Sequence, residues 1–213
     1  SLYRPIFASP RQSVREKKRN GQSRVRSSST VFGRNASLEQ PYVGNVSGMR
    51  ENRRRRLDLE YTWTIGPMTE EDVAAVAALE EANFSRPWSY DAFLKTLSDE
   101  KYIVIIAKKT DALLGYCVLL CTGEEADITN VCTAPKARGK GVARSMLTAL
   151  MKEGKSRGVT EFFLEVRESN TPARSLYTKL GFEEIGIRKN YYEEPKEHAV
   201  LMKKGSLDER VEV

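Results

Sequence analysis

A basic, glycine-rich stretch in the middle of the sequence offers its clearest chemistry. Arg138-Gly139-Lys140-Gly141 follows a β-branched run and leads into residues 142–147, whose apolar spacing predicts a helix. A strand that enters a helix through small residues leaves backbone N–H groups unpaired at the helix N-terminus, where the helix dipole is positive. Because Arg138, Lys140 and Arg144 add positive charge there, the stretch predicts a site for a phosphate-bearing ligand.

The spacing of this stretch excludes two common nucleotide-binding loops. A nucleoside triphosphate loop would place Ser or Thr after its lysine, but Lys140 is followed by Gly141. A dinucleotide fingerprint would end on a small residue where Arg144 stands. The pattern R-G-x-G-x-A, from Arg138 to Ala143, instead resembles the pyrophosphate loop of the GNAT acetyltransferases. For these six residues alone, an ordinary basic turn before a helix is the alternative.

The charge of the chain is divided unevenly. Residues 1–66 hold 14 Lys and Arg against 5 Asp and Glu, whereas residues 67–213 hold 21 against 24. The net charge of +6 therefore comes from the head of the chain, and the rest is mildly acidic. Excess acid suits a basic protein substrate by electrostatic complementarity. The overall basicity does not by itself make the chain a nucleic-acid-binding protein.

The cysteines Cys117, Cys121 and Cys132 form no C-x-x-C pair, and the chain has one histidine. Neither a metal site nor a disulfide framework is predicted from them. Free thiols in or near strands favour a reducing, cytoplasmic location. No apolar run approaches the roughly 20 residues that a membrane span needs, so no membrane partner is expected.

Residues 1–60 are rich in Arg, Ser, Asn and Gly and lack sustained periodicity, so they are predicted to be a disordered basic extension. The run Arg53-Arg54-Arg55-Arg56 suits RNA or an acidic partner, although a solvated tail is favoured. An Arg- and Ser-rich head also resembles an organelle transit peptide. The sequence starts at Ser1 and its first methionine is Met49. We expect instead that residues 1–48 derive from an upstream fusion, a tag or a misassigned start.

The remainder is predicted to be one α/β domain at residues 61–204, with a polar tail at 205–213. Alternation over residues 61–65 predicts a first strand, which Gly66-Pro67 ends. Thr69, followed by three acidic residues, is predicted to cap a helix. The helical stripe that follows is Val73, Val76, Ala77 and Glu80, and after a loop at 84–88 Ser89 caps a second, short helix.

Three consecutive strands are predicted next, at 102–107, 113–121 and 126–133, with polar turns short enough for antiparallel hairpins. The helix after the glycine-rich loop should run to about Arg157. It leads to a buried strand at 160–166, which should lie parallel to 126–133. The last predicted elements are a helix from its cap Thr171 to Leu180, and strands 184–188 and 199–203 around a loop at 191–197.

Several stretches of the carboxyl half carry a more specific resemblance. Residues 164–170 read LEVRESN, residues 173–182 read ARSLYTKLGF and residues 187–192 read IRKNYY. Upstream, residues 86–89 read RPWS. Together with the glycine-rich loop, these stretches resemble the RimI-like branch of the GNAT family, the ribosomal-protein N-terminal alanine acetyltransferases. The resemblance covers about residues 65–204 and leaves the head outside.

The resemblance implies the GNAT fold, a mixed central sheet with antiparallel N-terminal strands, flanking helices and two parallel strands that splay apart around acetyl-CoA. The splayed strands would be 128–133 and 160–166, and no metal is expected. Gly139 and Ala143 differ from residues frequent in the family but are small where the backbone must approach phosphate. The implied cofactor-binding residues are Val131, Cys132 and Thr133 for the acetyl and pantetheine parts, Arg138, Gly139, Lys140, Gly141, Val142, Ala143 and Arg144 for the pyrophosphate, and Asn170.

Acetyl transfer to an amine needs one group that removes a proton from the ammonium and one that protonates the leaving thiolate. By resemblance the base is Glu165, at the end of a buried strand, and partial burial would raise its pKa toward neutrality. The matching acid is Tyr177, on the following helix. Taken alone, Glu165 also fits a surface carboxylate, and Tyr177 fits a core aromatic whose hydroxyl is hydrogen-bonded.

Three aromatic residues, Trp88, Tyr191 and Tyr192, are candidates for binding the acceptor. A core aromatic and a plain hairpin tip are the alternatives. His198 is interpreted as structural or solvated, because the family has no catalytic histidine there. Cys132, beside the expected acetyl position, suggests self-acetylation or thiol modification, and its alternative is a small buried apolar residue.

The leading hypothesis is acetyl transfer from acetyl-CoA to the N-terminal α-amine of a basic small-subunit ribosomal protein that begins with alanine. A lysine or small-amine acetyltransferase of the same fold is one alternative. The other, of a different class, is a ribosome- or RNA-binding adaptor that acts through the basic head. Nucleic acid is not otherwise expected as a partner, and no feature indicates an oligomeric state.

Overall fold

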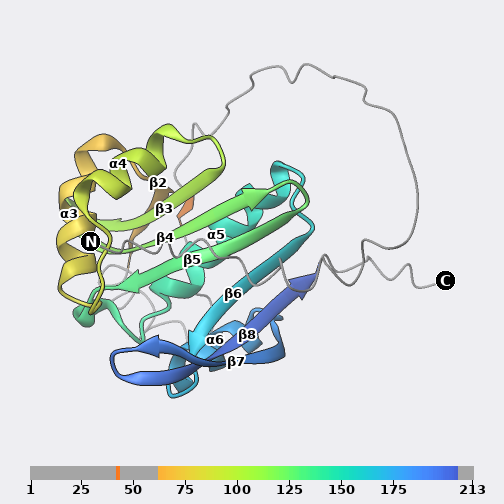
Figure 1. Ribbon diagram of the computed structural model, residues 1–213. Coiled ribbons are helices and arrows are strands. Elements are labelled where there is room, and N and C mark those ends of the chain that lie inside the picture. The colour runs from red at the N-terminus through yellow and green to blue at the C-terminus, as the bar shows by residue number, and fades with distance from the viewer. Residues whose placement is uncertain (1–41, 44–61, 206–213) are drawn as a thin grey trace, which may run out of the picture. The chain divides into compact units, whose positions relative to one another are not determined.

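The structure, a computed structural model, describes residues 42–43 and 62–205. Within them one mixed sheet has the strand order β1-β2-β3-β4-β5-β6-β8-β7 (Figure 1). Helices flank both faces of this sheet, so the predicted α/β architecture with a mixed central sheet is confirmed. The strands are β1 (Tyr42–Val43), β2 (Thr64–Pro67), β3 (Tyr102–Lys109), β4 (Ala112–Thr122), β5 (Glu125–Thr133), β6 (Glu161–Arg167), β7 (Glu183–Glu193) and β8 (Lys196–Gly205). The helices are α3 (Val73–Glu81), α4 (Tyr90–Ser98), α5 (Val142–Ser156) and α6 (Thr171–Lys179), with short 3-10 turns at Glu70–Asp72 and Pro135–Ala137.

The head of the chain is described at two residues only, Tyr42–Val43, which pair with β2 as an antiparallel strand. The predictions made for the rest of residues 1–60, including the arginine run, lie outside the described residues. The same holds for most of the polar tail. Among the helices that the structure does describe, none combines the length and apolarity needed to cross a membrane.

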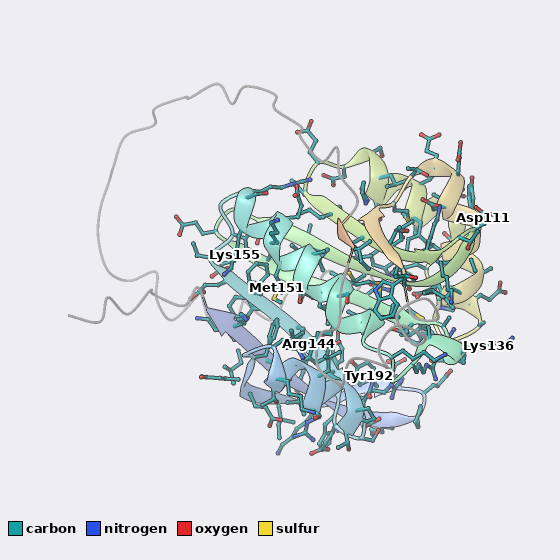
Figure 2. The ribbon with its side chains drawn as sticks, turned by 180° about the vertical axis from the view of Figure 1, so that it is seen from behind. Asp111, Lys136, Arg144, Met151, Lys155 and Tyr192 are labelled. Carbon is teal, nitrogen blue, oxygen red and sulfur yellow. The ribbon has the colours of Figure 1, made fainter. Side chains whose placement is uncertain are left out.

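Two apolar cores form because the strands alternate their side chains between the two faces of the sheet. On one face Cys117, Leu119 and Ile128 pack with the buried stripe of α5. On the other face Tyr116 and Val118 pack with Val76 of α3 and Phe93 of α4. Figure 1 shows α3 and α4 on the near side of the sheet and α5 on the far side, and Figure 2, seen from behind, brings α5 to the front.

The predicted helix starts are confirmed with one shift. Thr69 and Asp72 form the expected capping box, and the Ser89 hydroxyl accepts from the Ala92 N–H at 3.2 Å. The α6 cap is wrong by one residue, because the Asn170 carboxamide oxygen, not Thr171, accepts from the Ala173 N–H at 3.2 Å. Asn is as good a cap as Thr or better, and it stands immediately before the helix.

Two predicted strand boundaries are also wrong. β2 continues through Gly66 and Pro67, which pair with Ile106 and Ile105 of β3. The final hairpin is much longer than predicted, so that Tyr191 and Tyr192 lie inside β7 and not in a loop. Because β7 is an exposed edge strand with a register shift between Arg188 and Tyr192, it lacks the regular alternation by which strands are recognised.

Gly115 in β4 provides a test of how closely β4, β5 and α5 approach one another. A Cβ added at Gly115 would lie 2.5 Å from the Cys132 carbonyl oxygen and 2.8 Å from Met146 Cε. Since the backbone of β5 must then shift, Gly115→Ala should lower the free energy of unfolding by about 1–3 kcal/mol. The matched control is Gly66→Ala in β2, where no heavy atom lies within 4 Å of the added Cβ, and its effect should stay within about 0.5 kcal/mol. Urea denaturation measures both, and equal midpoints for the two variants would contradict the packing described.

Candidate active site

The parallel strands β5 and β6 pair only over their first halves. Their partners run from Glu125 with Glu161 to Ile128 with Leu164. Beyond this point β5 continues beside β4 alone as far as Thr133, and β6 continues beside β8 alone as far as Arg167. The two strands therefore separate toward their carboxyl ends. The predicted splayed pair is present, and its opening lies where parallel sheets commonly bind ligands.

A bulge in β5 begins at the same point. Leu119 of β4 lies opposite Ile128, but Val118 lies opposite Asn130, so Thr129 is an extra residue. One extra residue reverses the alternation of side chains that follow. Ile128 faces the core under α5, whereas Cys132 faces the core under α3 and α4. The Thr129 hydroxyl is one of two buried side-chain atoms in the described part of the chain without a hydrogen-bond partner.

The glycine-rich loop lies at the N-terminus of α5. Gly139 and Gly141 have φ angles of 72° and 89°, in the left-handed region where glycine is favoured. No side chain caps α5, and a Cβ added at either glycine would meet nothing within 4 Å. The loop thus presents helix N–H groups to an open space, as the predicted anion site requires. Val142 contributes its backbone only, since its side chain is buried in the core.

Arg138 does not point into this open space. Its Nε donates to the Thr133 carbonyl oxygen at 3.1 Å and its Nη2 to Asn83 Oδ1 at 2.6 Å. It therefore fastens the start of the loop to the end of β5 and to the end of α3. Arg144, in the first turn of α5, is exposed. Figure 2 shows Arg144 toward the loop end of α5 and Lys155 toward the other end.

Glu165 lies on β6 immediately after the last residue that pairs with β5. Its neighbours Leu164 and Val166 face the α5 core, so its side chain points to the opposite face of the sheet. The carboxylate is 18% exposed and forms an ion pair of 3.0 Å with Arg188. Burial raises the pKa of Glu165, and the hydrogen bond from Tyr191 and the charge of Arg188 partly oppose that rise.

Tyr191 and Tyr192 stand beside this carboxylate. Their rings contact edge to face at 5.1 Å, and the guanidinium groups of Arg188 and Arg167 lie over them at 4.9 Å and 4.1 Å. Burial together with the charge of Glu165 raises the pKa of Tyr192 to about 12. Both phenols are therefore protonated at neutral pH and can act as hydrogen-bond donors.

Tyr177 lies in the α5-side core, on the opposite face of the sheet from Glu165. It is 7% exposed on α6 and packs against Phe182 with 5.9 Å between ring centroids. Burial raises the pKa of its hydroxyl, and Cys117 and Tyr192 add to the rise. Tyr177 belongs to the same apolar core as Leu164 and Val166, the residues on either side of Glu165 on β6.

The predicted acceptor residues come from two segments that meet. Trp88 packs on Phe93 at 5.5 Å between ring centroids. Earlier in the same loop, Arg86 forms an ion pair with Glu193 at the end of β7, and Ser85 Oγ donates to the Glu194 carbonyl oxygen at 3.4 Å. The loop between α3 and α4 thus contacts the β7–β8 turn.

The remaining predicted residues are distributed around the opening. Val131 and Thr133 are half-buried on β5, and Asn170 uses its carboxamide oxygen as a helix cap. Cys132 is 4% exposed, and burial raises the pKa of its thiol to about 12. Since the thiolate is the reactive form, the buried apolar interpretation of Cys132 is favoured over self-acetylation. His198 Nδ1 accepts from the Asn190 N–H at 3.0 Å, which supports a structural role.

The burial of the Glu80 carboxyl group was not predicted from the sequence. Glu80 is 1% exposed and accepts hydrogen bonds from the Tyr116 hydroxyl, from Asn130 Nδ2 at 3.1 Å and from the Trp88 N–H at 3.3 Å. Burial raises its pKa to about 7. A carboxylate on the apolar stripe of a helix was the available signal, because carboxylates are rarely buried without a specific partner. Among the described residues, no cluster of His, Cys, Asp and Glu could hold a metal ion.

Comparison with known proteins gives consistent matches. The family model described as Acetyltransferase (GNAT) family matches residues 68–182. The ribosomal protein bS18-alanine N-acetyltransferase of Haemophilus ducreyi is 34% identical over 141 residues, which are 65% of this chain and 97% of that protein. The crystal structure of the Escherichia coli ribosomal-protein-S18-alanine N-acetyltransferase superposes with a TM-score of 0.62 and 30% identity over 68% of this chain and 94% of that one. The NatC complex bound to Gag peptide and CoA shares the fold, with a TM-score of 0.61 and 20% identity over 67% of this chain and 98% of that one.

Proposed function

This chain belongs to the acetyltransferase (GNAT) family, and on that premise we propose that it transfers the acetyl group of acetyl-CoA to the N-terminal α-amine of a small-subunit ribosomal protein that begins with alanine. The observation that carries the proposal is the position of Glu165, a mostly buried carboxylate at the point where β5 and β6 separate. The acceptor class follows the names of the relatives from Haemophilus ducreyi and Escherichia coli. The catalytic domain is assigned to residues 61–204, and the protein to the cytoplasm.

The donor is held by the splayed strands and the glycine-rich loop. When bound, acetyl-CoA supplies the acetyl thioester. The open loop with its uncapped helix end fits a pyrophosphate, since it offers N–H donors and positive charge. Lys140 and Arg144 add cationic side chains, whereas Arg138 acts by holding the loop in place. The residues assigned to the donor are Val131, Cys132, Thr133, Arg138, Gly139, Lys140, Gly141, Val142, Ala143, Arg144 and Asn170.

Glu165 acts as the general base on the acceptor amine. The α-amino group of a peptide has a pKa near 8, so at neutral pH much of it is protonated and cannot attack. A carboxylate whose pKa is raised by burial accepts this proton more readily than an ordinary surface glutamate. Arg188 and Tyr191 orient the carboxylate by binding it.

Tyr177 acts as the general acid on the leaving sulfur. Its raised pKa keeps the hydroxyl protonated at neutral pH, so that a proton is available for a thiolate. Base and acid approach from opposite faces of the sheet. They can serve the same reacting centre because the strands are separated there and no backbone hydrogen bonds close the gap.

The acceptor is assigned to the region where the α3–α4 loop meets β7 and the β7–β8 turn, and where Trp88, Tyr191 and Tyr192 lie. The β7–β8 turn and the strand ends beside it carry Glu193, Glu194 and Glu197. Of these, Glu193 pairs with Arg86 and Glu197 pairs with Arg167 at 3.2 Å. Acidic side chains at this edge suit the basic tail of a ribosomal protein. The adaptor alternative rests on the basic head, which lies almost wholly outside the described residues.

The proposal is tested by incubating the full chain with acetyl-CoA and a peptide panel. The peptides share one basic sequence and begin with Ala, Ser, Met or Leu, and a further peptide has a blocked N-terminus and an internal lysine. We expect the alanine peptide to be preferred in kcat/KM by about tenfold or more, the discrimination that a small pocket can supply. Mass spectrometry should place the acetyl group on the α-amine. Acetylation of the blocked peptide alone would identify a lysine acetyltransferase, and no transfer at all would contradict the proposal.

The base role predicts a pH-dependent loss of activity in Glu165→Gln. Below about pH 8 the acceptor amine is mostly protonated, so the variant should lose on the order of 10²-fold or more in kcat/KM. Above pH 9 the free amine needs no base, and the loss should shrink. The matched control is Glu168→Gln, an exposed glutamate just after β6. A loss that is the same at every pH would remove Glu165 from the base role.

Tyr177→Phe tests the acid role separately. The substitution removes the hydroxyl and keeps the ring that packs against Phe182, so folding should be preserved. The kcat should fall on the order of 10²-fold, while the acetyl-CoA Kd from calorimetry should stay within about threefold. If the Kd rises with no separate loss in kcat, Tyr177 has a binding or structural role instead.

A further inference from the structure

Glu80 is a buried carboxyl group that the proposed chemistry does not use. In the described part of the chain three polar or charged residues are buried, Asp72, Glu80 and Thr96. Asp72 forms a capping box and an ion pair with Lys108, and Thr96 bonds the carbonyl oxygen one turn earlier, so both have ordinary structural roles. Glu80 differs because all three of its hydrogen-bond partners come from outside its own helix, and from three separate segments. Burying a carboxyl group is destabilising unless the group is hydrogen-bonded. The partners of Glu80 therefore decide which elements the buried group can hold together.

The three partners of Glu80 belong to separate elements. The Trp88 N–H, at 3.3 Å, is in the loop that leads to α4. Asn130 Nδ2, at 3.1 Å, is in β5 directly after the extra residue of the bulge. The Tyr116 hydroxyl comes from β4 below. One carboxyl group therefore holds the α3–α4 loop to the bulged strand.

The bulge is what brings Asn130 to Glu80. If the strand had no extra residue at Thr129, every second side chain after Ile128 would face the α5 core, as Ile128 does. With it, Asn130 and Cys132 face α3, and Glu80 contributes to the raised pKa of Cys132. Glu80 thus binds, through Asn130, the part of β5 that has separated from β6. This is the part of β5 that is assigned to the acetyl group.

A second contact ties the same end of α3 to the donor side. Asn83 lies three residues after Glu80, and its Oδ1 accepts from Arg138 Nη2 at 2.6 Å. Its own amide donates to the Leu79 carbonyl oxygen at 2.7 Å, which fixes the side chain. Arg138 also binds the Thr133 carbonyl oxygen. The last turn of α3 is therefore attached to both ends of the separated part of β5.

We propose that Glu80 is a positioning residue that holds the acceptor loop, residues 82–89, against the bulge of β5 and thereby sets the affinity for the incoming protein N-terminus. This inference rests on the proposed function, because it assigns one wall of the acceptor site to that loop. Glu80 touches no reacting atom in this scheme. It acts through the Trp88 backbone and through Asn130, which lie on the two sides of the site.

The hydrogen bonds of Glu80 predict different effects for two substitutions at this position. Glu80→Ala leaves the Tyr116 hydroxyl, the Asn130 amide and the Trp88 N–H without their acceptor in a buried place, where unpaired groups are destabilising. The acceptor loop should then no longer be held against β5. Glu80→Gln keeps an oxygen for Asn130 and Trp88 and nearly the same shape. Because burial raises the pKa of Glu80, the neutral glutamine also resembles the protonated form that this burial favours.

The experiment compares KM for the alanine peptide with Kd for acetyl-CoA. In Glu80→Ala we expect the peptide KM to rise about tenfold or more while the acetyl-CoA Kd changes less than about threefold, and Glu80→Gln should restore the peptide KM to within about threefold. A merely structural role would reduce the amount of active enzyme and hence kcat. It would not change KM, which is independent of enzyme concentration.

Two further variants complete the test. Asp72→Asn alters another buried carboxylate, at the start of α3, and should lower stability without raising the peptide KM. Asn130→Ala breaks the contact from the β5 side and should raise the peptide KM several-fold, even if Glu80→Ala does not fold. An unchanged peptide KM in the Glu80 and Asn130 variants, or an equal rise in Asp72→Asn, would overturn this inference alone. A wild-type chain that acetylates no peptide would overturn the proposed function and this inference with it.

Discussion

The separation of β5 from β6 is the constraint on which the rest of this structure depends. Beyond Ile128 and Leu164 the backbone groups that point across the gap have no partner strand, so each strand must be held by the neighbour on its other edge. Here β4 continues to pair with β5, and β8 continues to pair with β6. The two outer strands therefore hold the gap open. Without β8 inserted between β6 and β7, the end of β6 that carries Glu165 would be an unsupported edge.

The gap also explains why the site is divided between two faces of the sheet. Strand alternation sends Glu165 to one face, whereas Tyr177 packs in the core of the other face. In a closed sheet these groups would be separated by a continuous layer of backbone. The bulge at Thr129 adds a third effect, since it turns Asn130 and Cys132 toward α3. The bulge thus changes which side chains of β5 face α3 at the point where β5 and β6 separate.

Two carboxyl groups near this gap, those of Glu165 and Glu80, differ in their burial and in the charge of their partners. Glu165 is partly buried and is balanced by Arg188 and Tyr191, and its pKa is raised only in part. Glu80 is buried more deeply, with uncharged donors from Tyr116, Asn130 and Trp88 around it. The first environment suits proton exchange with an acceptor, because a substrate can reach it. The second suits a fixed anchor, because hydrogen bonds inside a core hold their groups in place.

The sequence by itself determined the order of the elements, the parallel strand pair and the glycine-rich loop before α5, because each depends on local patterns. Hydrophobic period, capping residues and the glycines of Arg138–Ala143 are properties of short segments. Only the tertiary structure decided that Arg138 turns toward Asn83, that Tyr191 and Tyr192 belong to β7, and that Glu80 meets Asn130. Those contacts join residues 50 or more positions apart, or depend on a bulge without a sequence signature, so no local pattern contains them. The glycine-rich loop could thus be recognised in advance, whereas the contacts of Glu80 with Asn130 and of Arg138 with Asn83 could not.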